Sequence, residues 1–135
     1  TLKRIEYNTF NGCKNLKSIE LPEKLEHIGK WCFRGSALES VELPGSLRTI
    51  AQGSFSGCAS LATAKFGEGL ETLGTNEYAP DGMPIEGVFD SSALERVELP
   101  STLKRIEYCS FLQCSKLRSI TLPEGLEHVG PACFS

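Results

Sequence analysis

The chain has 135 residues, with 40% hydrophobic and 23% charged side chains and a formal net charge of −3. A mildly acidic chain repels a phosphate backbone, so its composition argues against nucleic acid as a partner. The apolar runs are only a few residues long, whereas a membrane-spanning helix needs about 20 apolar residues in succession. We therefore expect no membrane span in this segment.

One apolar pattern recurs from the first residues to the last. Its opening leucine returns at steps of 23, 22, 23, 33 and 23 residues, at Leu2, Leu25, Leu47, Leu70, Leu103 and Leu126. A period in the twenties is typical of a solenoid, in which each repeat forms one coil that is too small to fold alone. The sequence therefore predicts a single repeat segment over residues 1–135, with about six coils of which the terminal ones are incomplete.

The first repeat indicates the elements of a coil. Leu16, Ile19 and Leu21 form the motif Leu-x-x-Ile-x-Leu. Ile19 and Leu21 are two residues apart and so point to the same face of a strand. Pro22 has no N–H group and ends that strand. The same motif predicts strands near residues 38–43, 61–66, 94–99 and 117–122.

A second apolar pair, Leu25 and Ile28, follows the proline and precedes Gly29. Glycine adopts conformations that other residues avoid, so we expect Gly29 to turn the chain into the segment that carries Phe33. That segment is long enough for one turn of α-helix or 3₁₀-helix. We expect the phenylalanines of successive coils to form one buried column, made of Phe10, Phe33, Phe55, Phe89 and Phe111.

Two longer-range features overlie the repeat. The 33-residue step predicts an insertion over about residues 75–88, in the fourth coil. Residues 1–34 also align without gaps with residues 102–135, which indicates duplication of a unit of two coils. Because the chain begins and ends inside a repeat, we expect it to be a piece of a longer array.

The repeat resembles the BspA-type leucine-rich repeat, whose motif runs roughly L-P-x-x-L-x-x-I-G-x-x-x-F-x-x-C-x-x-L-x-x-I-x-L-P. The matching residues are Leu21-Pro22, Leu25, Ile28-Gly29 and Phe33, and Phe10, Cys13, Leu16 and Ile19 in the neighbouring coil. The resemblance implies an α/β repeat solenoid, a right-handed leucine-rich-repeat coil that is rich in strands with short helical or 3₁₀ turns. It also implies adhesion, surface display or protein binding, without a shared chemical site.

The six cysteines are expected to be free thiols that pack in or near the core. Cys13 and Cys58 are two coils apart, which places them about 10 Å from each other, too far for a disulfide. Cys114 occupies the equivalent place in a later coil. For the remaining three, spacing alone leaves open a bridge from Cys32 to the adjacent coil. With neither a C-x-x-C motif nor a histidine-rich set, the sequence predicts no zinc site.

The first candidate binding surface is the outer face of the predicted strands. Two positions on that face give a mildly acidic patch centred on Glu39, Glu42, Glu95 and Glu98, with Lys65 in the intervening coil. A ligand could bind there. The alternative is a plain solvated face, because exposed strand positions are polar and charged residues also prevent edge pairing.

The second candidate is the insertion, because extra loops of a repeat protein gather on one face and often bind ligands. Pro80-Asp81-Gly82 indicates a turn within it. Tyr78 and Met83 are apolar enough to meet a partner or to fold back on the scaffold. The alternative is a neutral surface excursion.

The sequence offers no catalytic set. His27 and His128 occupy the same repeat position beside Glu26 and Glu127, so we expect them to face outward and to serve the repeat. An enzyme needs a nucleophile, a base and a stabilising group in one pocket. No such pattern, phosphate loop or metal-spaced carboxylate set occurs, so we expect no catalysis and no cofactor.

These features together predict a non-enzymatic surface that binds a protein or a glycan. By resemblance, it belongs to a larger microbial protein that is extracellular or attached to the cell surface. A passive structural spacer is the main alternative. An intracellular interaction scaffold is the third hypothesis, and free thiols favour it.

Overall fold

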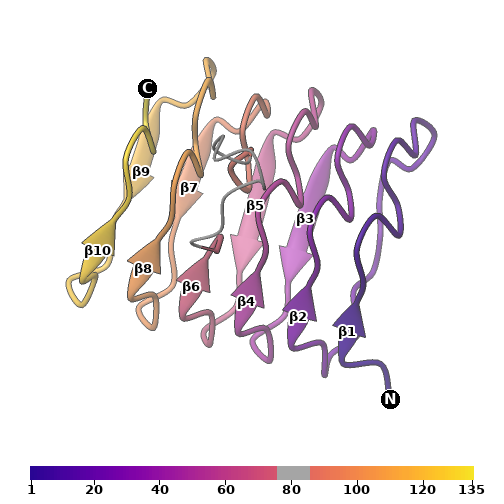
Figure 1. The fold of residues 1–135 in the computed structure, drawn as a ribbon, viewed down its shortest axis with the longest axis horizontal. Coiled ribbons are helices and arrows are strands. Elements are labelled where there is room, and N and C mark those ends of the chain that lie inside the picture. The colour runs from indigo at the N-terminus through magenta and orange to yellow at the C-terminus, as the bar shows by residue number, and fades with distance from the viewer. Residues whose placement is uncertain (76–85) are drawn as a thin grey trace, which may run out of the picture.

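The computed structural model describes residues 1–75 and 86–135, so Tyr78 and Met83 lie outside the described residues. The described chain winds into a solenoid with two rows of parallel strands (Figure 1). One row is a continuous six-stranded sheet of β1 (Arg4–Ile5), β2 (His27–Ile28), β4 (Thr49–Ile50), β6 (Thr72–Leu73), β8 (Arg105–Ile106) and β10 (His128–Val129).

The second row, which we call the split sheet, contains the longer strands. It consists of two ladders of two strands each, β3 (Ser40–Leu43) with β5 (Thr63–Phe66) and β7 (Arg96–Glu98) with β9 (Ser119–Thr121). These four strands lie where the Leu-x-x-Ile-x-Leu motif predicts them. Residues 16–21 of the first coil carry the same motif and have no assigned strand.

Strand pairing follows the repeat. Ile5 pairs with Ile28, which pairs with Ile50, so each coil is bonded to the next one in the same register. β6 pairs with β8 through Thr72 and Arg105 although 33 residues separate them. The insertion therefore leaves the six-stranded sheet in register, and the predicted stacking of coils is confirmed.

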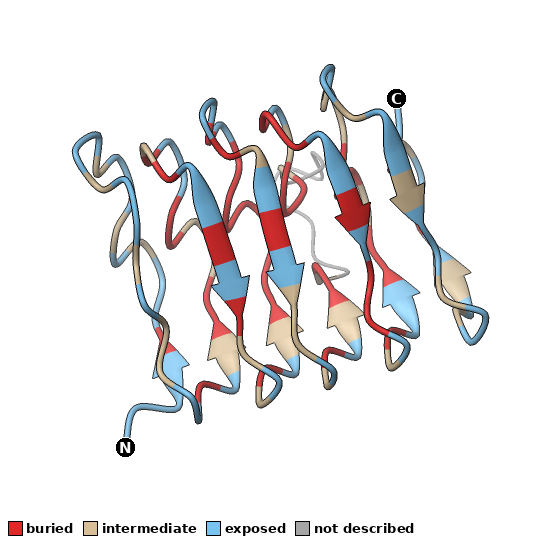
Figure 2. Cartoon of the chain, turned by 180° about the vertical axis from the view of Figure 1, so that it is seen from behind, coloured by how far each residue is buried: buried red, intermediate tan, exposed pale blue. Residues whose placement is uncertain are grey.

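The core lies between the two rows of strands (Figure 2). Its centre is a column of stacked phenylalanine rings, with successive centroids 5.2 to 5.6 Å apart, formed by Phe10, Phe33, Phe55, Phe89, Phe111 and Phe134. The four inner rings are no more than 1% exposed. The predicted column is thus confirmed, with one further ring at the end of the chain.

The expectation of short helical turns is wrong for the described residues, which contain no helix. In the second coil, Trp31 and Gly35 lie two residues before and after Phe33 and have φ of 54° and 64°. Left-handed residues interrupt helical hydrogen bonding. The backbone N–H of Phe33 instead donates to the carbonyl of Ser54 in the next coil, at 2.8 Å.

Gly29 has a different role from the predicted one. A Cβ atom at this position would lie 2.9 Å from the backbone nitrogen of Tyr7 in the preceding coil. Glycine is therefore needed here for close approach of two backbones. Gly130, its copy, is in the same position against Tyr108.

Cysteines and serines alternate in a second column beside the phenylalanines. Cys58 Sγ lies 3.1 Å from the carbonyl oxygen of Phe33 and 3.5 Å from Ser36 Oγ. Cys114 repeats this contact with Phe89 and Ser92. All six cysteines are free, as expected, including Cys32. Burial raises the pKa of the Cys32 thiol to about 11, so this group is a structural hydrogen-bond donor.

Truncation of one inner ring tests the column. Phe55 stacks between Phe33 and Phe89 and is fully buried, so we expect Phe55→Ala to lower the free energy of unfolding by about 3–5 kcal/mol. Phe134→Ala is the matched control, because Phe134 stacks on one ring and is 45% exposed. Urea unfolding followed by circular dichroism measures both. Equal losses in the two variants would contradict the column as the main source of stability.

Candidate functional site

The outer face of the split sheet brings together five of the seven residues that the sequence indicates as binding candidates. Glu42 on β3 pairs in register with Lys65 on β5. Glu98 lies on β7, and its side chain is exposed like the other two. Backbone hydrogen bonds through Ala62 connect the positions of Glu39 and Glu95, which precede β3 and β7 and are also exposed.

Arg96 changes the character of this face, and sequence reasoning missed it. It is exposed on β7 and lies two residues before Glu98, so the two side chains share the outer face. Together with Lys65, it interrupts the acidic patch with positive charge. The sequence does indicate this position, because side chains two residues apart on a strand share a face, and Arg96 is two residues from Glu98.

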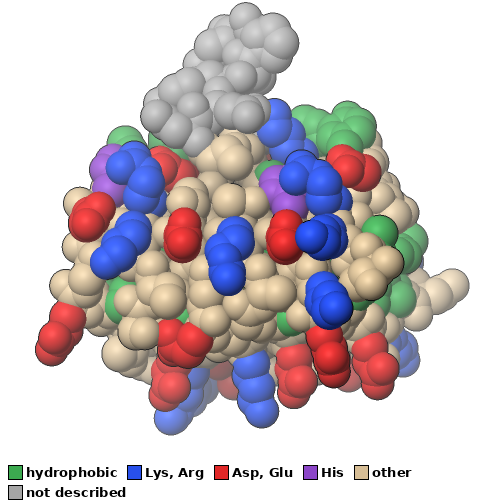
Figure 3. Space-filling model, turned by 90° about the horizontal axis from the view of Figure 1, so that it is seen from below, with side chains coloured by type: hydrophobic (Ala, Val, Ile, Leu, Met, Phe, Trp, Pro, Cys, Tyr) green, Lys and Arg blue, Asp and Glu red, His purple; other side chains and the backbone are tan. Residues whose placement is uncertain are grey.

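A regular alternation of charge runs along the edge of the six-stranded sheet where the chain enters its strands. The position that precedes each strand changes sign from coil to coil, and these six exposed residues are Lys3, Glu26, Arg48, Glu71, Lys104 and Glu127. Backbone hydrogen bonds join each of them to the next, as between Arg48 N and the Glu26 carbonyl at 2.9 Å. Lys3 and Glu26 form an ion pair at 3.7 Å. Figure 3 shows acidic and basic side chains alternating along this side of the molecule.

The C-terminal end of the insertion is tied to an earlier coil. Arg34 donates two hydrogen bonds of 2.7 Å to the carboxylate of Glu86. This pairing lowers the pKa of Glu86 and raises the pKa of Arg34. Arg34 lies in the second coil and Glu86 in the fourth, so the ion pair spans the coil between them. The predicted roles of Tyr78 and Met83 concern residues outside the described part of the chain.

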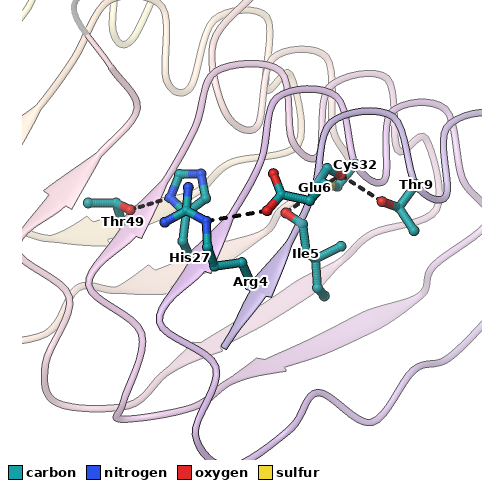
Figure 4. Close-up of polar contacts among 7 residues, drawn as sticks. All are labelled: Arg4, Ile5, Glu6, Thr9, His27, Cys32 and Thr49. Carbon is teal, nitrogen blue, oxygen red and sulfur yellow. Dashed lines mark hydrogen bonds and ion pairs between the residues drawn. The ribbon is translucent and has the colours of Figure 1, made fainter. Parts of the chain in front are cut away.

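His27 is the centre of a polar cluster on the six-stranded sheet (Figure 4). A hydrogen bond of 2.5 Å joins His27 Nδ1 to Thr49 Oγ1 on the next strand. Arg4 Nε donates to Glu6 Oε1 at 3.3 Å in the preceding coil. Burial lowers the pKa of His27, and the positive charge of Arg4 lowers it further, while Glu6 acts in the opposite direction. The histidine thus lies on the outer face, as the sequence predicts, and is half-buried between coils.

The duplication repeats this cluster in a more buried setting. Arg105 Nε donates to Glu107 Oε1 at 2.7 Å, and His128 Nε2 lies 3.5 Å from Glu107 Oε2. The side chain of Glu107 is 5% exposed, whereas that of Glu6 is 72% exposed. A coil packs on each side of Glu107, and a Cβ atom at Gly74 would lie 3.1 Å from it. The buried carboxylate is thus paired with a guanidinium, as burial of charge requires.

These clusters connect neighbouring coils, as the contact between His27 and Thr49 does. Among residues 1–75 and 86–135, no group of three or more His, Cys, Asp or Glu side chains is placed to hold a metal ion. No helix in these same ranges is long and apolar enough to cross a membrane.

The lowered pKa of His27 predicts how stability changes with pH. Protonation is easier in the unfolded chain, where the pKa is about 6.5, so the folded state loses stability as the pH falls through that value toward the lower folded pKa. We expect His27→Gln to lose less stability than the unmodified protein between pH 7.5 and 5.5. Urea unfolding at the two pH values measures this difference. The same pH dependence in both proteins would show that His27 is not the source of the pH-dependent loss of stability.

Comparison with known proteins identifies the repeat. The sequence profile described as BspA type leucine-rich repeat region matches residues 1–80 and 85–135 in six copies. The crystal structure of a leucine-rich repeat protein from T. pallidum is similar with a TM-score of 0.67 and 25% identity, over 96% of this chain and 67% of that one. A leucine-rich repeat protein from Bacteroides ovatus matches with a TM-score of 0.46 and 18% identity, over 96% of this chain and 43% of its own. No curated protein matches the chain.

Proposed function

The chain belongs to the BspA-type leucine-rich repeat family, and on this premise we propose that it binds a protein through the outer face of the split sheet. Leucine-rich repeats of this kind generally act as non-enzymatic interaction scaffolds. We choose this face as the binding surface because its strands are paired in register. Ser40, Glu42 and their neighbours on β5 are held in paired positions and remain exposed.

Fixed backbones favour binding because little flexibility is lost when a partner docks. The side chains on this face point outward from a ladder whose other side is buried in the core, as Val41 and Leu43 are 2% and 4% exposed. Recognition then depends on which charged or hydroxyl group each coil presents. Each coil therefore holds its exposed positions in a fixed place, and only the side chains at those positions differ from coil to coil.

The six-stranded sheet is the weaker candidate for recognition. The row of charges along its edge alternates in sign at every step, so each charge has opposite charges beside it. Neighbouring opposite charges satisfy one another and contribute modestly to stability. The face of the split sheet lacks this strict alternation, since Glu42 on β3 lies beside Glu20, which occupies the equivalent position in the preceding coil. Its charges are therefore more available to a partner.

Charge reversal on the split sheet tests the proposal. A random peptide library displayed on phage is panned against the unmodified protein, and the selected peptides are then measured against variants by interferometry. We expect the double variant Glu39→Lys, Glu95→Lys to weaken binding at least tenfold. The two exposed carboxylates attract positive groups of the ligand, and the lysines that replace them would repel those groups.

The matched control carries the same change of net charge elsewhere. Glu71→Lys with Glu127→Lys alters two exposed positions away from the split sheet, and we expect it to leave binding within about twofold. Thermal unfolding by circular dichroism verifies that both variants fold. Equal binding to both variants would reject the face, and a library without selected peptides would favour the passive spacer.

We also infer an extracellular or cell-surface location, since proteins with BspA-type repeats are typically surface-bound or secreted in bacteria. The expected result is that an amine-reactive biotin reagent that does not cross membranes labels this protein on intact cells of the native host. Exposed lysines such as Lys3 and Lys104 provide the reactive groups. Labelling only after lysis would instead favour the intracellular scaffold. A cytosolic enzyme of the same cells is the control for leakage.

A further inference from the structure

A groove opens on the split sheet between the first two coils. It has a volume of about 600 Å³ and lies between residues 18–23 and residues 40–44. Its apolar lining includes Ile19 and Leu21, which are partly buried and so remain accessible in part. Its polar lining consists of two serines and three glutamates, Ser18, Ser40, Glu20, Glu23 and Glu42. The size falls in the usual range of ligand-binding clefts.

Strand pairing is interrupted along the groove, as it also is between β5 and β7. β3 pairs with β5 on one side, but no ladder in the described residues joins β3 to residues 18–21 on the other side. Glu39 N still donates to the Lys17 carbonyl at 3.1 Å, so the two coils meet just before β3. Beyond that bond the neighbouring segment lies beside β3 without continuing the sheet. The groove therefore follows the direction of an extended strand.

The charges around the groove differ from those elsewhere on the same face. In adjacent coils, equivalent positions of this face often combine opposite charges, as in Lys17 with Glu39, Glu42 with Lys65, Lys65 with Glu98, and Glu95 with Arg118. Across the groove the equivalent positions are Glu20 and Glu42, which are both negative and both exposed. Like charges on neighbouring strands destabilise a sheet. A cation bound between them would relieve that repulsion.

We propose that this groove binds an extended, basic segment of the partner protein, an inference that rests on the proposed function of the split sheet. Lysine or arginine side chains of the segment contact Glu20, Glu23 and Glu42. The hydroxyl groups of Ser18 and Ser40 bond to its backbone. The apolar floor accepts the side-chain stems, which are themselves aliphatic.

An extended conformation follows from the length and direction of the groove. Residues 40–44 line one side and give it the length of a short strand. In an extended peptide alternate side chains point to the same side, so lysine at every second residue directs all the charges toward the carboxylates. A peptide with the same composition but with its lysines in one block directs only half of them that way.

Two synthetic peptides test this reading against the intact protein. One is Lys-Ala repeated four times, and the other has four lysines followed by four alanines; both carry a fluorescent label for anisotropy measurements at low ionic strength. We expect the alternating peptide to bind several-fold more tightly than the block peptide. The double variant Glu20→Gln, Glu42→Gln should weaken the alternating peptide about three- to tenfold, since each exposed ion pair contributes up to about 1 kcal/mol.

The matched control is Glu71→Gln with Glu127→Gln, which removes the same charge from two exposed positions beside the six-stranded sheet. We expect this variant to retain binding within about twofold. Equal losses in the two double variants would show that the peptide follows the net charge of the protein and would overturn the groove. Equal binding of the two peptides would overturn the extended register. If library-selected peptides bind the split sheet while the alternating peptide does not, the groove fails and the proposed function stands.

Discussion

The stacking of each coil on the next is the interaction on which the whole protein depends. Phe33 lies 5.2 Å from the rings on both sides, and the N–H groups of Phe33 and Gly35 donate to carbonyls of the next coil. A coil alone would leave both ring faces and those N–H groups in water. The local conformation of every coil, including its left-handed residues, is therefore stable only within the stack.

Stacking also restricts where function can lie. The inner positions are fixed by the core, and the backbone groups are used between coils, so the exposed side chains are the remaining variable. Equivalent residues in adjacent coils are direct neighbours across the strands, as Glu42 and Lys65 are. Residues more than twenty positions apart in the sequence thus form one surface. A binding site on this protein is a property of several coils together.

The sequence predicts the interior better than the connections. Periodic leucines and phenylalanines indicate the core, the register and the longer strands, because one face of each strand must be buried. The six-stranded sheet was missed, since strands of two residues such as His27–Ile28 are too short to show alternation. The helical turns were wrong because Trp31, Ser91 and Gln113 adopt positive φ without being glycine. Inter-coil hydrogen bonds impose that conformation, and a single repeat does not reveal them.

The candidate site was likewise predictable only where it follows from alternation along a strand. Alternation along a strand selects Glu42 and Glu98, but the groove depends on a ladder that is absent between two coils. Burial of Glu107 likewise follows from its place between two coils, because its copy Glu6 is largely exposed. Such environments arise from position in the stack. Residue type and spacing alone do not encode them.

The internal duplication separates residues that serve the stack from residues that serve a partner. The Arg-Glu-His cluster occurs in both copies and connects coils in both, so its presence reflects packing. On the outer face beside β3, by contrast, Glu20 corresponds to Thr121, while Ile19 and Leu21 beside it correspond to Ile120 and Leu122. This replacement would remove a carboxylate of the groove and keep the apolar positions beside it. The part of this surface that the copies do not share is therefore the part where selective recognition is expected.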